Sequence, residues 1–255
     1  MLERLRARRP LVHCLTNHVV KNFTANALLA LGAAPAMVEH PEEAAEFAAM
    51  ASALLVNIGT LDEAQMAAIL RAVPAATGAN RPWVLDPVAV GPLTLRTQFA
   101  RQLLADRPTL IRGNASEIIA LAGQAGHGRG VDSGDASESA ISAAKALALA
   151  SGGAVLVTGP IDYVTDGKTV RSCANGHVLL TRVTGVGCAQ GALAAACLAV
   201  ADSPLQAGLA VAAILGVAGE MAAARSSRPG AFQGALLDAL DEMDSTSLSH
   251  HAKLT

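Results

Sequence analysis

Four points of the sequence carry side chains and backbone groups that could do chemistry on a small molecule. They are Thr16–His18, Asp86, Arg112–Glu117 and Thr184–Cys188. Together they offer a guanidinium and helix N–H groups for phosphate, acids for a divalent cation, and a thiol. Each point also has a purely structural explanation, so they are weighed one by one.

The first two points allow two interpretations each. Asn17 can cap the helix that follows it, which is sufficient to explain the residue, or it can contact a small molecule. Asp86 closes a predicted strand, where it can cap a turn or hold a divalent cation through water. Both alternatives stay open at this stage.

The third point combines Arg112 with an Asn-x-x-Glu pair, Asn114 and Glu117. The pair matches a capping box at the start of a helix. Capping alone can explain it, yet Arg112 also suits phosphate and Glu117 suits a metal-bound water network.

The fourth point opens an alanine-rich helix with two glycines, Gly185 and Gly187. Glycine allows close approach of the backbone, and the free N–H groups of a first helical turn form an anion site. Cys188 lies within that turn, where we expect the field of the helix to lower the thiol pKa. Tight packing around a small buried cysteine explains the same residues, so the glycine pair alone is a weak signal.

Several common signatures are missing from the sequence. GxxxxGK[ST] and GxGxxG do not occur, which excludes a Walker A loop and the usual dinucleotide fingerprint. There is no Gly-x-Ser-x-Gly elbow, and no histidine stands in a motif that would pair with a nucleophilic cysteine.

Composition narrows the class of protein further. Hydrophobic residues form 52% of the 255 residues, charged residues 16%, and the formal net charge is -2. Such a chain can bury a large core, and it lacks the basic patches and aromatic platforms that bind nucleic acid. Four scattered cysteines without a CxxC argue against a disulfide framework and against structural zinc. We expect a reduced, globular, cytoplasmic protein.

Short apolar runs alternate with helical patterns up to about residue 160. This alternation predicts an α/β fold: a central, mostly parallel sheet flanked by helices on both faces. The expected strands are 11–15, 36–38, 53–58, 83–85, 109–111 and 154–158. The expected helices are 19–31, 42–51, 62–73, 96–104, 115–123, 138–150, 189–201, 204–224 and 230–243. Three more runs, 161–165, 169–172 and 178–181, predict a short antiparallel edge. Ligands of such sheets bind beyond the carboxyl ends of the strands, which is where the four points fall.

Two uncharged stretches, 183–201 and 203–219, are long enough to suggest membrane spans. Alanine and glycine dominate them, and no aromatic belt or basic flank accompanies them, so we expect two buried, tightly packed helices and no membrane association. No linker divides the chain, which predicts one domain over residues 1–255. We expect residues 1–10 to form an exposed peripheral turn rather than a signal peptide, 245–255 to be a frayed tail, and 123–137 to be a surface loop.

Taken in order, longer segments of the chain resemble the hydroxyethylthiazole kinase family of the ribokinase-like superfamily. The resemblance runs from about residue 11 to about 240 with similar spacing. The segments are VHCLTNHVVKNFTANALLALGAAPAM (12–37), LVNIGTL (55–61), VLDPVAVG (84–91), IRGNASEI (111–118), VTGPIDYVTDG (157–167), NGHVLLTRVTGVGC (175–188) and GAFQ (230–233).

The resemblance implies an ATP-dependent kinase that phosphorylates the hydroxyl of 4-methyl-5-(2-hydroxyethyl)thiazole, with Mg²⁺, in thiamine biosynthesis or salvage. It also implies a homotrimer with active sites between neighbouring subunits. Its site residues would be Asn17, Val19, Met37 and Gly185 for the thiazole, Arg112 and Thr158 for ATP, Asp86 and Glu117 for the metal and phosphate region, and Cys188 at the position of the catalytic base.

Two other functions remain alternatives. One is another ribokinase-like enzyme, such as a pyridoxal or hydroxymethylpyrimidine kinase, and the other is a non-catalytic thiazole-binding regulator. The cysteine that ends TGVGC favours the thiazole kinase over the first, since sugar and pyrimidine kinases of the superfamily usually have aspartate there. The four residues Asp86, Arg112, Glu117 and Cys188 argue against a degenerate regulator.

Overall fold

The computed structural model describes residues 1–123 and 137–255, so most of the predicted surface loop 123–137 lies outside the described residues. Within the described residues the strands form one sheet in the order β2-β1-β3-β4-β5-β6-β7-β8. Neighbours from β2 to β6 pair in parallel, whereas β6-β7 and β7-β8 are antiparallel. The strands are β1 (Leu11–Leu15), β2 (Ala34–Ala36), β3 (Ala53–Asn57), β4 (Trp83–Asp86), β5 (Leu110–Asn114), β6 (Ala154–Thr158), β7 (Asp162–Thr165) and β8 (Val170–Cys173).

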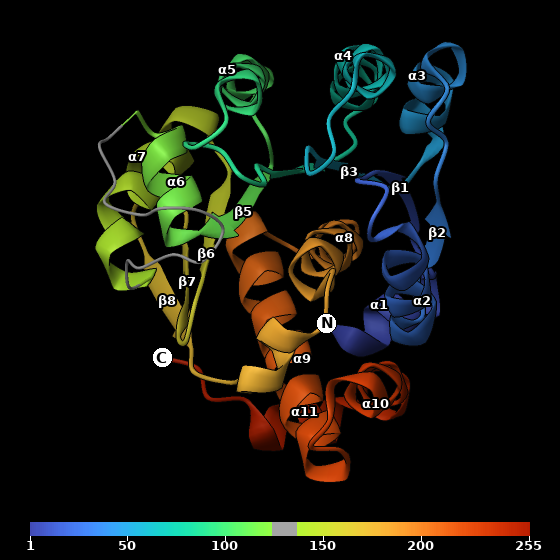
Figure 1. Cartoon of the computed structure of the whole chain (residues 1–255), viewed down its shortest axis with the longest axis vertical. Coiled ribbons are helices and arrows are strands. Elements are labelled where there is room, and N and C mark those ends of the chain that lie inside the picture. The colour runs from blue at the N-terminus through green and yellow to red at the C-terminus, as the bar shows by residue number, and fades with distance from the viewer. Residues whose placement is uncertain (124–136) are drawn as a thin grey trace.

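Helices cover both faces of the sheet, as the sequence predicts (Figure 1). One face packs on α3 (Pro41–Met50), α4 (Glu63–Gly78), α5 (Thr94–Leu103), α6 (Ala115–Leu121) and α7 (Ile141–Ser151). The other packs on α1 (Leu2–Arg8), α2 (Lys21–Leu31), α8 (Val186–Leu198), α9 (Pro204–Arg225) and α10 (Pro229–Glu242), and α11 (Ser245–His251) follows. Successive residues of a strand point to opposite faces, so Leu54 and Val56 join one core and Leu55 joins the other. A sheet buried on both sides explains why its strands are continuous apolar runs.

The strand order reverses at β1. The chain passes from β1 to β2 on one side, and then crosses to β3 on the other side of β1. At such a reversal the two crossovers leave in opposite directions, which opens a crevice at the carboxyl ends of the central strands. The ends of β1 and β3 therefore border the expected ligand site.

Most predicted elements lie within a few residues of the observed ones. The strand expected at 36–38 is β2 at Ala34–Ala36, and β5 continues to Asn114 rather than ending at 111. Asp62 caps α4, and Asn114 with Glu117 forms the predicted capping box of α6. The two uncharged stretches are α8 and α9, which belong to the core. Of the described helices, α9 is long and apolar enough to cross a membrane, but 67% of that apolar window is buried.

The strand predicted at 178–181 is wrong. Residues Val178–Arg182 form the 3-10 helix η3, and His177 caps it by accepting a hydrogen bond from the N–H of Leu179. The edge of β8 is occupied by the C-terminal segment instead, through backbone hydrogen bonds between Ser172 and Thr255 and a bridge from Cys173 to Leu254. Residues 178–181 therefore have no strand to pair with there.

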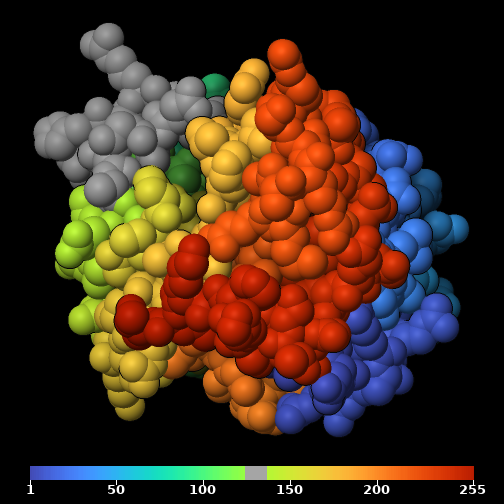
Figure 2. All heavy atoms as spheres, turned by 90° about the horizontal axis from the view of Figure 1, so that it is seen from below, coloured from blue at the N-terminus to red at the C-terminus, as the bar shows by residue number. Residues whose placement is uncertain are grey.

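Both chain ends are more ordered than the sequence predicts. The tail is helical in α11, capped by Asp244, and then extends along β8, where Figure 2 shows it in dark red across the yellow segment. Residues 1–10 are not an exposed turn, because α1 buries Leu2 and Leu5. Arg6 fastens α1 by donating to the carbonyls of Leu240 and Asp241 at the end of α10, at 2.9 and 2.7 Å. Cationic groups are favourable at such a helix end.

We expect Leu5→Ala to destabilise the protein by about 2–5 kcal/mol, as is usual when a fully buried leucine is truncated. Leu5 is 0% exposed, whereas Leu29 on α2 is 56% exposed. Leu29→Ala is therefore the matched control, with an expected cost of less than about 0.5 kcal/mol. Urea unfolding followed by circular dichroism measures both, and equal costs would contradict the packing of α1.

Candidate active site

The carboxyl ends of neighbouring parallel strands bring the predicted polar residues to one edge of the sheet. Asn17 lies two residues past β1, Asp86 is the last residue of β4, and Thr158 is the last residue of β6. Arg112 lies within β5, paired in register with Leu156 of β6. The prediction that Asn17, Asp86 and Arg112 share one edge is confirmed, and Thr158, which the resemblance implies, lies at the same edge.

A chain of side-chain contacts runs across this edge. The Asn17 amide Nδ2 donates to Asn57 Oδ1 at 2.9 Å and to Cys188 Sγ at 3.3 Å. Asn57 Nδ2 in turn donates to Asp86 Oδ2 at 2.6 Å. The other carboxylate oxygen, Asp86 Oδ1, lies 3.6 Å from Arg112 Nη1, which is an ion pair rather than a hydrogen bond. The chain thus joins the end of β1 to β5 through β3 and β4.

Asp86 is a fully buried carboxylate with one oxygen, Oδ1, that accepts no hydrogen bond. Burial raises the pKa of Asp86 to about 7; Arg112 opposes this rise and Glu117 adds to it. An under-coordinated buried oxygen at the edge of a sheet is a ligand that Mg²⁺ accepts, usually together with waters and substrate phosphates. The donor set fits that ion only in this partial way, because the described residues include no cluster of three or more metal-ligating side chains.

Arg112 is held in place by two further contacts. Its Nε donates to Gln190 Oε1 at 3.0 Å and its Nη2 to Thr158 Oγ1 at 3.3 Å. Burial lowers the pKa of Arg112, but the carboxylates of Asp86 and Glu117 raise it by more, so the guanidinium stays charged. Its side chain is 12% exposed, which leaves a charged group at the edge of the site for an anion.

The carboxylate of Glu117 accepts hydrogen bonds from backbone N–H groups rather than from side chains. Its Oε2 accepts from the N–H of Asn114 within the capping box, and its Oε1 accepts from the N–H of Ala89 at 2.9 Å. The carboxylate therefore joins the start of α6 to the turn after β4. The structural explanation of Glu117 is confirmed, and its charge also lies near Asp86 and Arg112.

The double-glycine turn opens beside the charge pair. Gly185 is the N-cap of α8, with a φ of 92° that favours glycine, and a Cβ there would lie 2.8 Å from Val20 Cγ1. A Cβ on Gly187 would lie 3.0 Å from Arg112 Nη2. Gly185, Gly187 and Cys188 are partly exposed, so the turn is not sealed inside the protein. The first N–H groups of any helix have no intrahelical acceptor, and here they lie next to the guanidinium.

The expectation that the helix lowers the pKa of the Cys188 thiol is wrong. Burial raises this pKa to about 11, and the carboxylate of Asp86 adds to the rise, while Asn57, Arg112 and Asn17 lower it by less. The desolvation of a thiolate in the first turn of α8 outweighs the field of the helix end. Cys188 is therefore a neutral thiol at physiological pH.

Two predicted apolar contacts, Val19 and Met37, lie in the segments that follow β1 and β2. The N–H of Val19 donates to Asn17 Oδ1 at 3.2 Å, but its side chain is 66% exposed. Met37 follows β2 directly and is partly buried. The next residue, Val38, is held by His13 Nε2 at 2.7 Å from its carbonyl oxygen.

Sequence reasoning missed three polar residues of this edge: Asn57, Gln190 and Asp162. Asn57 is the last residue of β3 and precedes Ile58-Gly59, just as Asp86 is the last residue of β4. A polar residue at the end of an apolar run is visible in the sequence and could have identified Asn57. Gln190 is a buried polar side chain in an alanine-rich helix. Burial raises the pKa of Asp162 to about 6. The hydrogen bond from the N–H of Gly159 and the positive charge of Arg112 partly offset this rise.

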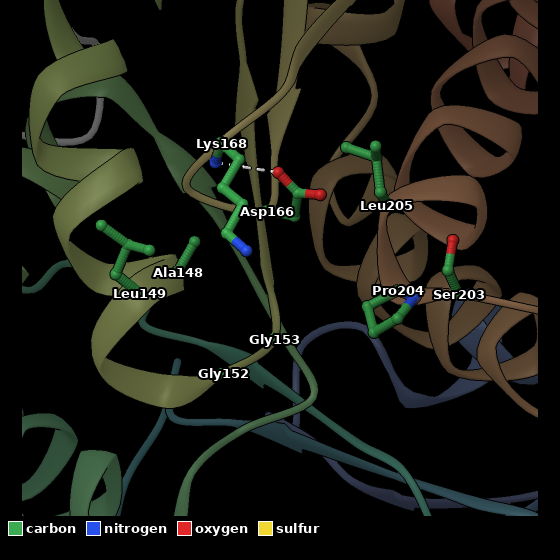
Figure 3. A pocket seen from close by; sticks show the side chains of 9 residues that line it. All are labelled: Ala148, Leu149, Gly152, Gly153, Asp166, Lys168, Ser203, Pro204 and Leu205. Atoms are coloured by element: carbon green, nitrogen blue, oxygen red, sulfur yellow. Dashed lines mark hydrogen bonds between the residues drawn. The ribbon is translucent and has the colours of Figure 1, made fainter.

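A separate hollow of about 350 Å³ lies at the opposite edge of the sheet, where β6 begins (Figure 3). Asp166 and Lys168 belong to the turn after β7, and the Asp166 carboxylate accepts from the N–H of Lys168 at 2.9 Å. None of the predicted site residues line this hollow. Its lining residues are Ala148, Leu149, Gly152, Gly153, Asp166, Lys168, Ser203, Pro204 and Leu205.

The fold and the site together define a protein of the ribokinase-like class. Its features are the mostly parallel sheet, the reversal of strand order at β1, and the start of α8 beside Asp86 and Arg112 at the carboxyl edge of the sheet. The solved ADP complex of Bacillus subtilis pyridoxal kinase has this fold. Its TM-score with this chain is 0.61 at 17% identity, over 82% of this chain and 91% of that one. This likeness concerns the fold alone.

A narrower relationship comes from the whole sequence. A family model described as the hydroxyethylthiazole kinase family matches residues 2–246. Hydroxyethylthiazole kinase of Granulibacter bethesdensis is 54% identical over 253 residues, which cover 99% of this chain and 92% of that relative. The solved hydroxyethylthiazole kinase protein of Pyrococcus horikoshii OT3 has a TM-score of 0.92 at 38% identity, over 100% of this chain and 96% of that one. The chain belongs to the hydroxyethylthiazole kinase family, so it is an enzyme of the kinase class and ATP is its implied co-substrate.

We expect Cys188 to react slowly with iodoacetamide near neutral pH. With a thiol pKa of about 11, the thiolate fraction at pH 8 is about a hundredfold or more below that of a free cysteine. The labelling rate, followed by mass spectrometry, should rise about tenfold per pH unit up to about pH 10. Cys188→Ser gives the background from the buried Cys14, Cys173 and Cys197. Labelling that is already fast and pH-independent at pH 7 would contradict a neutral thiol.

Proposed function

We propose that this protein transfers the γ-phosphoryl group of ATP to the hydroxyl of 4-methyl-5-(2-hydroxyethyl)thiazole, a step of thiamine biosynthesis or salvage. One observation carries the proposal: the open Gly185–Cys188 turn begins α8 directly beside Arg112 and Asp86. Phosphoryl transfer requires mainly that the reacting groups are aligned and that the dispersed negative charge of the transition state is stabilised. The N-terminus of a helix and a guanidinium can supply this stabilisation. The names of the relatives supply the substrate.

On the phosphate side, we assign Arg112 and Thr158 to ATP. Arg112 is charged, partly exposed and held by Gln190 and Thr158, so it is oriented before an anion arrives. Orientation of the donor in advance avoids a reorganisation cost during transfer. Asp86 and Glu117 would hold Mg²⁺ in the phosphate region, directly or through water, and the ion would neutralise phosphate charge there.

On the alcohol side, we assign Asn17, Val19, Met37 and Gly185 to the thiazole. Asn17 is fixed by Asn57, so its position relative to the helix mouth is defined. An apolar surface from Val19 and Met37 suits a neutral ring, which needs contact area more than charge. Cys188 occupies the position of the base, but its neutral thiol makes it a polar contact for the hydroxyl rather than a proton acceptor at pH 7.

The proposal includes the state of the protein in the cell. We propose one domain over residues 1–255, a homotrimer with active sites between subunits, and a cytoplasmic location without nucleic-acid or membrane partners. The 66% exposure of Val19 supports a site completed by a neighbouring subunit, since an apolar substrate contact needs cover. The single sheet that runs through the chain supports the single domain.

Substrate choice gives the direct test. Purified protein with Mg²⁺ and ATP should consume ATP with the thiazole alcohol, and at least about a hundredfold less efficiently with pyridoxal or hydroxymethylpyrimidine. Product is measured by mass spectrometry, with ATP hydrolysis in the absence of any alcohol as background. A preference for either of the other two alcohols would assign the protein to another ribokinase-like activity, and binding of the thiazole without turnover would indicate a regulator.

Two variants test the roles of Arg112 and Cys188. Arg112→Ala should lower kcat/KM about a hundredfold to a thousandfold, because it removes a donor to developing phosphate charge. Cys188→Ser should lower kcat less than about tenfold, because a loose transition state lets the alcohol proton leave late and the thiol is protonated already. If Cys188→Ser lost more than about a hundredfold while ATP still bound, the thiol would be a true general base.

A further inference from the structure

Through its side chain, Asn57 hydrogen-bonds to a residue in each half of the proposed site. It ends β3 between β1 and β4, and it is fully buried. On one side it accepts from Asn17, which we assign to the alcohol. On the other side it donates to Asp86, which we assign to the phosphate region. In the sequence Asn57 lies within the segment LVNIGTL (55–61), for which the resemblance implies no role.

The hydrogen bonds determine how the Asn57 amide is oriented. Oδ1 accepts from two donors, Asn17 Nδ2 at 2.9 Å and the N–H of Gly59 at 3.0 Å. The NH₂ group must then face Asp86 Oδ2 at 2.6 Å. The flipped amide would place oxygen against a carboxylate and NH₂ against two donors, so the network allows one orientation.

The surroundings leave Asn17 little freedom around this bond. A Cβ on Gly59 would lie 2.7 Å from Asn17 Nδ2 and 2.9 Å from Asn17 Cβ, so the backbone of Gly59 lies directly against the Asn17 side chain. Gly59 is itself held by Asn57. Asn57 thus fixes Asn17 twice, by its own oxygen and through the turn that follows β3.

Asp86 depends on Asn57 in a different way. The contact from Asn57 is 2.6 Å, whereas that from Arg112 is 3.6 Å and too long for a hydrogen bond. A buried carboxylate needs hydrogen-bond donors to hold one rotamer and to offset desolvation. The short bond from Asn57 fixes which oxygen of Asp86 faces Arg112.

We propose that Asn57 is a positioning residue for the phosphoryl transfer, which sets the distance and orientation between the alcohol contact Asn17 and the carboxylate of Asp86. The inference rests on the proposed function and deepens it. Reacting groups must be held to within a fraction of an ångström, and a displacement of about 1 Å can cost about a hundredfold in rate. An amide is required at residue 57, because it is an acceptor towards one neighbour and a donor towards the other.

A buried asparagine could also serve stability alone, and the chain offers a matched control for that role. Asn175 is buried, and its Nδ2 donates to the carboxylate of Glu220 at 3.3 Å and to the carbonyl of His251 at 2.9 Å. It fastens the C-terminal segment and contacts none of the site residues. In both asparagines a change to aspartate replaces an amide donor to a carboxylate with a second carboxyl group.

The experiment compares Asn57→Asp, Asn57→Ala and Asn175→Asp with wild-type protein. Asn57→Asp keeps the acceptor for Asn17 and loses the amide donor to Asp86, so that the two facing carboxyl groups share a proton and Asp86 loses its full charge. It should lower kcat about a hundredfold while the Kd of the thiazole alcohol, measured by isothermal titration calorimetry, changes less than about threefold. Asn57→Ala loses both contacts, so kcat should fall at least as far and the Kd should rise about tenfold. Asn175→Asp should lower Tm but leave kcat and Kd within about twofold.

Each protein is assayed well below its own Tm, and Asn57→Ser replaces a variant that does not fold. If both Asn57 variants lowered Tm as Asn175→Asp does but kept wild-type kcat and Kd, Asn57 would be structural and the inference wrong. Equal losses of alcohol binding in Asn57→Asp and Asn57→Ala would also overturn it, since the retained acceptor would then do nothing. Failure of the proposed function is distinguishable, because wild-type protein itself would then lack turnover of the thiazole alcohol.

Discussion

The site depends on one charge pair, the fully buried Asp86 and the partly exposed Arg112, where the sheet meets the start of α8. A carboxylate with no exposure loses its hydration, and burial raises its pKa to about 7. Removing either partner of such a pair leaves an uncompensated buried charge, which is strongly unfavourable. Hydrogen bonds from the surrounding residues offset the cost of burying the pair: Asn57 donates to Asp86, and Gln190 and Thr158 accept from Arg112. Strands β3 to β6 and helix α8 are thereby held in one arrangement.

The small residues of α8 follow from the same constraint. A Cβ on Gly191 would lie 3.0 Å from Leu55 Cδ1 and 3.3 Å from Asp86 Oδ2, and one on Gly187 would meet the Arg112 guanidinium. Larger side chains would push the helix away from the sheet and its first N–H groups away from the charge pair. The alanine and glycine content that superficially suggests a membrane span therefore serves close packing. A helix that approaches this closely can direct its positive end at a phosphate group.

The sequence predicted the structure correctly where patterns of neighbouring residues determine the strands. The ends of parallel strands must share an edge, so the meeting of Asn17, Asp86 and Arg112 followed once the strands were recognised, and the resemblance added Thr158. The sequence-based prediction failed where contact with a distant segment determines the local structure. Residues 178–181 could not be a strand because residues 253–255 occupy that edge, and the first ten residues could not stay exposed because Leu2 and Leu5 fit against the core. Local patterns contain no information about which distant segment packs against such a surface.

By itself the sequence determined the α/β class, the approximate position of most elements and the helix caps, because periodicity and capping residues are properties of nearby residues. The order and spacing of its motifs along the whole chain indicated the family. Only the tertiary structure decided the chemistry of individual groups. The thiol of Cys188 is neutral rather than activated, and Asn57, at the end of β3, joins Asn17 to Asp86 by hydrogen bonds. Both depend on burial and on distances of about 3 Å between segments far apart in the chain, and these arise only when the sheet and α8 close over the buried charge pair.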